Sequence, residues 1–264
     1  VRSAHTSMSK IVRLVWFDLK PQLMPPVWIL LQWVNFSVQI LVYGALISQL
    51  VSLEKTAVMG DYRNFYAVGL VVMMTFEIGS HTGRHFVEHA HEGRLPYLLS
   101  LPISRSTLFL VIALQGGAEL ALMLAVPLVF LLVMLGNLTI ISVAASIFTL
   151  FWLGFGVAGL MLGLSFIAFK SSDFYTAIVT GLSAVIIRFS TVLYPLMFLQ
   201  AYAGAALFSP LTYGSDLVRL LLGFDPSILL EPTIAVAVLT ALAVSTLGLG
   251  LVLIQRLVEG VKSA

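Results

Sequence analysis

The stretch that decides the fold is "LTIISVAASIFTLFWLGFGVAGLMLGLSFIA", residues 138–168, which contains no charged residue. A helix that crosses the hydrocarbon core of a bilayer needs about 20 mostly apolar residues. This stretch is longer than that, which predicts a spanning helix that is tilted or whose ends emerge from the bilayer. The stretch therefore makes a membrane protein the first hypothesis.

The composition of the whole chain supports this hypothesis. Of the 264 residues, 59% are apolar and 10% are charged, and the mean hydropathy is +1.04. A soluble domain carries about 25% charged residues, so this chain has too little polar material to cover a surface that faces water. The net charge of +2 comes from dispersed basic residues, so we expect no nucleic-acid partner. The absence of cysteine excludes disulfides and thiolate zinc ligands.

Six stretches are apolar enough to predict spanning helices. They cover residues 27–50, 64–82, 107–135, 138–168, 174–200 and 232–255. The first is too long for the apolar core of a signal peptide and has no cleavage site, so we expect it to remain as an anchor. No soluble domain fits between the spans. The sequence thus predicts an all-α membrane protein with one domain over residues 1–264.

The distribution of Lys and Arg orients this predicted domain, because cytoplasmic loops carry an excess of both. With the N-terminus inside, the cytoplasmic side holds Arg2, Lys10, Arg13, Lys20, Arg84, Arg94, Arg105, Lys170, Arg256 and Lys262. The outer side holds only Lys55, Arg63 and Arg219. We therefore expect a multi-pass protein of the cell membrane with both termini in the cytoplasm.

Two further segments are predicted to lie at the membrane without spanning it. In residues 8–22 the apolar positions recur at helical spacing and the basic ones lie elsewhere, which is typical of an amphipathic helix on the cytoplasmic face. This gives an interfacial helix within residues 1–26. Residues 201–226 are apolar but contain Pro210, Gly214 and Gly223, which divide them into pieces too short to cross. They are predicted to be re-entrant or interfacial helices on the outer side.

Four of the five histidines lie between His81 and His91, and residues 85–89 spell H-x-x-E-H, the signature of one class of zinc protease. On a helix, Glu77, His81, His85 and His89 would share a face. A zinc protease of this class needs a further acidic ligand downstream, and the later spans offer only a membrane-embedded one. Arg84 and Glu88 are spaced for an i,i+4 ion pair on this helix, so we expect a solvated helix face and no metal site.

Polar side chains within the predicted spans are candidates for a translocation path, because a charge at bilayer depth normally faces protein or water. These side chains are Gln32, Asn35, Gln39, Glu77, Glu119 and Arg188. Glu119 and Arg188 lie at similar predicted depths, so an ion pair between the third and fifth spans is one interpretation. The alternatives are that each faces a hydrated path separately, or that the fifth helix is broken and Arg188 lies nearer an interface.

Three segments of the chain resemble the permease subunit of type 2 ABC exporters. "LVWFDLK" (14–20) is similar to the interfacial helix before the first span, and "EGRLPYLLSLPISR" (92–105) to the family's cytoplasmic stretch. "YPLMFL" (194–199) with "SPLTYGSDLVR" (209–219) resembles its outer signature. Ser209 replaces the usual asparagine, and Pro96 stands where an acidic residue is common. With six spans, the resemblance covers essentially the whole chain.

This resemblance implies an ABC exporter in which a separate ATPase subunit supplies ATP and Mg²⁺ chemistry and a second permease copy completes the path. The chain has no G-x-x-x-x-G-K-[ST] loop, so we expect it not to be an enzyme by itself and to bind no cofactor. The polar helix 81–92 would be the coupling helix, and the residues expected to contact the ATPase are Arg84, Glu88, Glu92, Gly93 and Arg94. The outer gate would comprise Tyr194, Pro195, Pro210, Tyr213, Asp216 and Arg219. The transported substrate would be a drug, a lipid or a glycan-like molecule.

Two other functional classes stay open. One is a carrier or channel in the lipid bilayer that works without an ATPase. The other, more remote, is an intramembrane hydrolase, since Gly181-Leu182-Ser183 resembles the start of a nucleophile motif. No histidine follows His91, so its base would have to come from a cytoplasmic segment.

Overall fold

The structure, a computed structural model, describes residues 27–44, 46, 62–93, 104–136, 139–167, 171–199 and 202–262. Within these ranges the chain is helical and contains no strand, in agreement with the predicted all-α class. The predicted interfacial helix in residues 1–26 lies outside the described residues.

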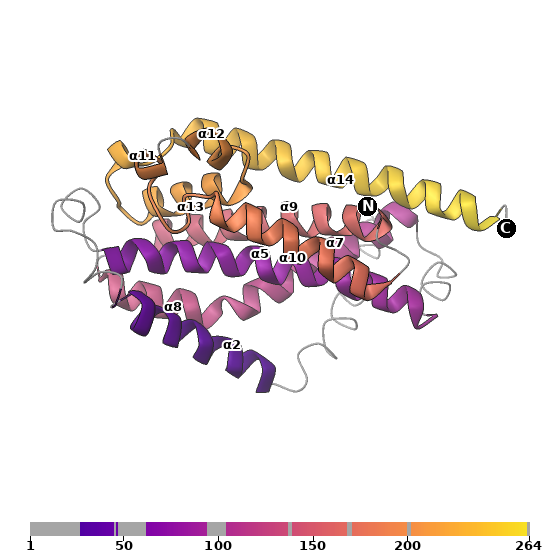
Figure 1. Cartoon of the computed structure of the whole chain (residues 1–264), viewed down its shortest axis with the longest axis horizontal. Helices are drawn as coiled ribbons and strands as arrows, with labels where there is room; N and C mark the ends of the chain where they lie inside the picture. Colours follow the sequence, from indigo (N-terminus) through magenta and orange to yellow (C-terminus); the bar gives the residue numbers. More distant parts are fainter. Residues whose placement is uncertain are drawn as a thin grey trace, which may run out of the picture.

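Six helical columns, one in each range predicted to span, make up most of the described chain; they run along the long axis of the molecule except the first, which is inclined to it (Figure 1). They are α2 (Val27–Val38) with the π-helical turn η1 (Gln39–Gly44), α5 (Tyr62–His91), α7 (Arg105–Met123) with α8 (Ala125–Leu135), α9 (Ile140–Ile167), α10 (Ser172–Arg188) and α14 (Pro232–Lys262). Between α10 and α14 lie α11 (Leu196–Leu199), α12 (Ala203–Ala206), α13 (Pro210–Leu221) and the 3-10 turn η3 (Pro226–Ile228). The two ends of the molecule are named according to the predicted topology. The end with α11–α13 is called the outer end, and the end where α5 stops at His91 is called the inner end.

Two of the described helices are long and apolar enough to cross a membrane by length and composition. These are α9 over Ile140–Phe166 and the first part of α14 over Pro232–Gly250. Shorter apolar stretches occur at Ile29–Val42, Thr107–Leu120 and Val126–Leu135. The charge-free stretch that opened the sequence analysis is therefore one of the two candidate spanning helices.

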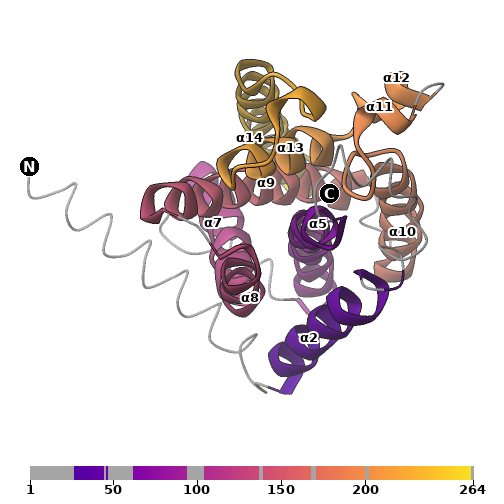
Figure 2. The ribbon, with the colours of Figure 1, turned by 90° about the vertical axis from the view of Figure 1, so that its left-hand side faces the viewer.

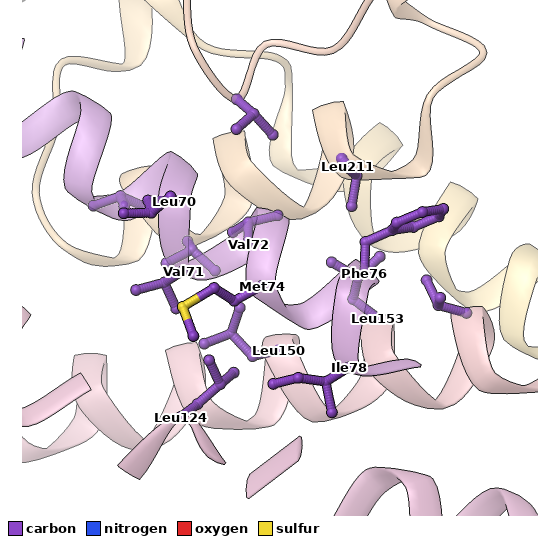
Figure 3. Packing of buried hydrophobic residues seen from close by; sticks show 14 of the residues in the cluster. Leu70, Val71, Val72, Met74, Phe76, Ile78, Leu124, Leu150, Leu153 and Leu211 are labelled. Atoms are coloured by element: carbon purple, nitrogen blue, oxygen red, sulfur yellow. The ribbon is translucent and has the colours of Figure 1, made fainter. Parts of the chain in front are cut away.

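Helix α5 occupies the centre of the molecule and packs on α9, α7, α10 and α13 (Figure 2). Its buried side chains meet Leu124 between α7 and α8, Leu150 and Leu153 of α9, and Leu211 of α13 (Figure 3). Small residues allow the closest approach: a Cβ at Gly79 would press on Val157 of α9. The fold thus surrounds one central helix with the others.

The third predicted span, residues 107–135, is interrupted at Leu124, where α7 ends and α8 begins. Pro127 has no N–H to offer to the carbonyl of Met123, four residues earlier, and this breaks the helical ladder. Trp33 of α2 donates its indole Nε1–H to that carbonyl at 2.9 Å. One residue of α2 therefore satisfies the oxygen that the proline leaves free.

The fifth predicted span, residues 174–200, is wrong from residue 189 onward, because α10 ends at Arg188 and a turn follows. The hydroxyl and the backbone N–H of Ser190 both donate to the carbonyl of Ile187, an arrangement that competes with helix continuation. The chain then turns through Thr191 and Val192 before Pro195 precedes α11. The alternative of a broken fifth helix describes the structure.

The prediction that Pro210, Gly214 and Gly223 divide the outer segment holds for two of the three. Pro210 is the first residue of α13, where its missing N–H costs nothing. Gly223 follows the helix with a φ of 87°, a conformation suited to glycine. Gly214 is inside α13, and a Cβ there would press on Leu153 of α9. It permits close packing instead of breaking the helix.

Candidate functional site

The inner half of α5 carries a polar face that the described residues leave partly open. We call it the polar stripe, and it comprises Glu77, Ser80, His81, Arg84, His85 and Glu88. On this face Glu77 and Arg84 are exposed and the others are partly buried. The positions recur at three- and four-residue steps and so lie on one side of the helix. Glu77, His81 and His85 therefore share a face, as their spacing predicted.

The same face of α5 is closed in its outer half. Tyr66 and Leu70 lie on the same face of α5 as Glu77, three and two helical turns before it, and they are 7% and 1% exposed, respectively. The turn η1 packs on α5, and its Ile40 belongs to the same buried cluster. The partly exposed polar stripe thus ends at Glu77, and buried apolar side chains follow beyond it.

The remaining polar candidates within the helices occupy different surroundings. On α2 and η1, Gln32 and Gln39 are partly buried and Asn35 is exposed. On α7, Glu119 is 5% exposed, although the described residues offer it no ion pair. The polar residues selected from the sequence therefore do not line one common path.

The interpretation that Arg188 pairs with Glu119 is wrong for this chain. Arg188 is the last residue of α10 and is exposed, whereas Glu119 is buried on α7. The two helices lie on opposite sides of α5 (Figure 2). The two residues have similar predicted depths in the membrane, but they do not meet, because α5 lies between their helices.

At the inner end, α5 continues without a break from its buried part into the segment predicted to couple to an ATPase. Arg84 donates from Nε to Oε1 of Glu88 at 2.8 Å, which confirms the i,i+4 pair expected from the sequence. The helix ends at His91, and Gly93 turns the chain with a φ of 74°. Glu92 and Gly93 are exposed, and Arg94 lies outside the described residues.

The histidines of this segment do not gather around a common point. The rings of His81 and His85 are 6.5 Å apart and nearly perpendicular. Nδ1 of His85 lies 3.5 Å from Oε2 of Glu88. Burial lowers the pKa of His85, and the nearby Glu88 carboxylate opposes this shift only in part. Within the described ranges no group of three His, Cys, Asp or Glu residues is arranged to hold a metal ion.

At the outer end, Arg219 of α13 is completely buried and connects three parts of the chain. Its Nη1 donates to the carbonyl of Thr191 at 2.7 Å, and its Nη2 to the carbonyls of Val192 at 2.7 Å and Phe65 at 3.1 Å. The guanidinium also lies 3.4 Å from the centre of the Phe65 ring, a cation–π contact. Arg219 thus joins α13 to the turn after α10 and to the start of α5.

Asp216, one turn before Arg219 on α13, completes this arrangement. Its Oδ1 lies 3.3 Å from Nη1 of Arg219 and accepts a hydrogen bond from the Thr191 hydroxyl at 2.9 Å. Its Oδ2 accepts from the backbone N–H of Leu230, just before α14, at 3.2 Å. We call Thr191, Ser215, Asp216 and Arg219 the outer polar node. It holds the outer ends of α5, α10, α13 and α14 together.

The other residues predicted for an outer gate lie around this node in different ways. Tyr213 is nearly buried and donates its hydroxyl to the carbonyl of Leu207 at 2.7 Å. Pro195 is buried, Pro210 is partly buried and Tyr194 is exposed. Asp216 and Arg219 are the members of the predicted gate that form the node.

The sequence analysis missed two residues of the node, Thr191 and Ser215, and the neighbouring Thr212. Thr191 and Ser215 share a hydrogen bond of 2.9 Å between their hydroxyls, and Thr212 accepts from the Thr191 N–H at 3.2 Å. A signal was available, since Thr212, Ser215, Asp216 and Arg219 recur at helical spacing within an otherwise apolar chain. That period predicts one polar face on α13, buried against its neighbours.

Ser183, the residue that suggested a hydrolase, has a structural role in α10. Its hydroxyl donates to the carbonyl of Thr180 at 2.9 Å, within the same helix. Neighbouring Gly181 is exposed, and no atom would contact a Cβ placed there.

Comparison with protein-family models finds no match to the sequence, and no curated protein matches it either.

Proposed function

We propose that this chain is the permease subunit of an ABC exporter, in which two copies form a path and a separate ATPase drives it. The proposal comes from the resemblance of residues 14–20, 92–105 and 194–219 to that family. It takes the six helical columns as membrane spans, with the inner end in the cytoplasm.

The observation that carries the proposal is the continuity of α5. A single helix of 30 residues joins a charged inner end, with Arg84 and Glu88, to Phe65, which contacts the outer polar node. A displacement applied to the inner end is therefore transmitted to the outer end without a hinge in between. Coupling ATP hydrolysis to the opening of an outer gate needs such a rigid connection.

The distribution of polar groups along α5 also supports export. The polar stripe is partly exposed toward the inner end, whereas Tyr66 and Leu70, which follow it toward the outer end, are buried. In the proposed membrane orientation this is a resting state that admits cargo from the cytoplasm. Closure of the ATPase dimer would then open the outer end.

The test is to purify the chain from its native membrane in mild detergent, identify the co-purifying subunits and measure ATP hydrolysis. We expect an ABC ATPase in stoichiometric amount. Reversing charge at Glu88 and Glu92 to lysine should abolish association or coupling while the protein still inserts. Glu231→Lys, at the outer end, is the matched control and should keep both.

Purified chain with no ATPase bound, and transport that proceeds without ATP, would contradict the proposal. That result would favour a carrier or channel. An ATPase that binds and couples normally to the Glu88→Lys/Glu92→Lys variant would contradict the assigned docking segment.

A further inference from the structure

Helix α10 is held to the rest of the described chain along one narrow strip. Its two buried residues are Tyr175 and Val179, which lie one turn apart. The residues exposed on its other sides include Phe174, Ala177 and Val185. α10 packs on α5 more than on any other described helix, and it lies at the edge of the molecule (Figure 2). Contacts with α5 therefore determine the position of α10.

The first attachment joins the inner part of α10 to α5. The Tyr175 hydroxyl donates to the carbonyl of Ser80 at 2.9 Å, and the residue is 1% exposed. The hydroxyl lies directly against Gly83, where a Cβ would press on it. Ser80 and Gly83 come just before Arg84, the first residue of α5 that we expect to contact the ATPase. This attachment therefore adjoins the proposed docking segment.

The second attachment joins the outer part of α5 to the turn that follows α10. The Tyr62 hydroxyl donates to the carbonyl of Leu193 at 3.0 Å. Two turns further along α5, a Cβ at Gly69 would press on the carbonyl of Val192, so the turn lies directly against the helix backbone. The outer polar node joins the same turn to the carbonyl of Phe65. Helix α5 thus holds α10 at both of its ends.

The two attachments are complementary in chemistry and in direction. Each pairs a buried tyrosine hydroxyl with a backbone carbonyl: Tyr175 of α10 bonds to α5, and Tyr62 of α5 bonds to the turn after α10. A buried polar group that loses its hydrogen bond is costly. Sliding of α10 along α5 would break both bonds at once and press the Val192 carbonyl into the α5 backbone. A displacement of α5 therefore carries α10 with it.

We propose that Tyr175 is a positioning residue of the export cycle, because it fastens α10 to α5 beside the docking segment so that the two helices move as one unit. The proposal rests on the proposed export function and deepens it, since it extends the moving part of the chain from α5 to α10. The attachment at the turn after α10 makes the outer ends of both helices move together as well. The exposed face of α10 then changes its position whenever the ATPase displaces α5.

The first test measures the separation of the two helices in the purified chain alone. The chain has no cysteine, so two introduced cysteines carry spin labels at defined positions. Glu77→Cys on α5 and Thr180→Cys on α10 replace exposed residues. We expect a narrow distribution of distances, which Tyr175→Phe broadens roughly twofold or more. Tyr213→Phe is the matched control: it removes a tyrosine hydroxyl that bonds to Leu207, outside α5 and α10, and should leave the distribution unchanged.

The second test uses the complex with the co-purified ATPase, without nucleotide and after trapping with ATP and vanadate. The distance between the labels at residues 77 and 180 should stay the same on trapping. The distance between labels at Thr180→Cys and Val244→Cys, an exposed position on α14, should change. In Tyr175→Phe the first distance should change as well, because α10 no longer follows α5. A purely structural role of the hydroxyl would lower stability without this loss of coupled motion.

Identical distributions for Tyr175→Phe and Tyr213→Phe would overturn the attachment. A distance between residues 77 and 180 that changes on trapping in the chain with Tyr175 intact would overturn the common motion, and so would an unchanged distance between residues 180 and 244. Thermal unfolding shows whether the variants fold; Gly83→Ala, which displaces the same hydroxyl, carries the test if Tyr175→Phe does not. Broadening in the chain alone without a co-purifying ATPase would support the attachment and refute the exporter. An ATPase that co-purifies while the distribution stays narrow in Tyr175→Phe would do the opposite.

Discussion

Arg219 donates a hydrogen bond of 2.7 Å from Nη2 to the carbonyl oxygen of Val192, a residue in the turn where α10 has already ended. Carbonyl groups of a buried turn have no helical partner, and an unpaired one is costly. Arg219 satisfies two of them, those of Thr191 and Val192, and also donates to the carbonyl of Phe65 in α5, because the terminal nitrogens of its planar guanidinium donate in different directions. The break in α10 and the arginine on α13 therefore depend on each other.

We expect Arg219→Ala to destabilise the chain by about 3–5 kcal/mol, because it strands Asp216 in a buried position and removes the donor to the turn carbonyls of Thr191 and Val192. Arg219→Lys should fall between this variant and the unmodified chain. Thermal unfolding in detergent is the measurement. Arg188→Ala, an exposed arginine at the end of α10, is the control and should change stability by no more than about 0.5 kcal/mol. Equal losses for Arg219→Ala and Arg188→Ala would refute a structural role of the node.

Gly69→Ala tests the same junction from α5. A Cβ at this position would press on the carbonyl of Val192 and on Nη2 of Arg219, so the turn and the arginine would have to shift. We expect a loss of stability of more than about 1 kcal/mol. Gly181→Ala is the control: it is exposed in α10, nothing contacts its Cβ, and it should stabilise by about 0.5–1 kcal/mol through helix propensity. The idea fails if both glycines tolerate alanine equally.

The positions of the helices could be predicted because each requires a long apolar run, and this signal is strong in a chain with 10% charged residues. The breaks within those runs were harder to predict. At Pro127 the signal was a missing N–H, which apolarity does not register. At Ser190 and Thr191 the signal for the break was the presence of hydroxyl groups, which compete for the carbonyls of the helix. Averaging the hydropathy over a window of residues detects neither of these two signals.

The candidate site was predicted only where it depends on one helix. The Arg84–Glu88 pair follows from spacing alone, and it forms. The pairing of Glu119 with Arg188 required two helices to be neighbours, which depth in a membrane does not determine. The outer polar node joins residues 65, 191 and 219, and only the folded arrangement brings them together.

A double-mutant cycle at Trp33 and Pro127 tests the account of the α7–α8 interruption. Trp33→Phe removes the donor to the Met123 carbonyl and should cost about 0.5–1.5 kcal/mol. In a Pro127→Ala background the new N–H can bond to Met123, so the same change should cost less. Thermal or denaturant unfolding of the four proteins gives the coupling energy. A cost of Trp33→Phe that does not depend on residue 127 would contradict this account.

We expect no functional zinc at the histidines of α5, because the described residues provide no third ligand for a metal site. Elemental analysis of protein purified with a tag free of histidine should find zinc well below one equivalent. His85→Ala and His89→Ala should leave this value unchanged. Stoichiometric zinc that disappears in both variants would reverse the interpretation.

The last prediction concerns Arg188 and Glu119, which the sequence suggested as a pair and the structure separates. With α5 between their helices, removal of one charge should not strand the other. We therefore expect the stability changes of Glu119→Gln and Arg188→Met to add within about 0.5 kcal/mol in the double variant, as they do for distant residues without shared partners. Unfolding of the two single variants and the double variant measures this sum. A double variant more stable than the sum by 1 kcal/mol or more would show that the two charges interact after all.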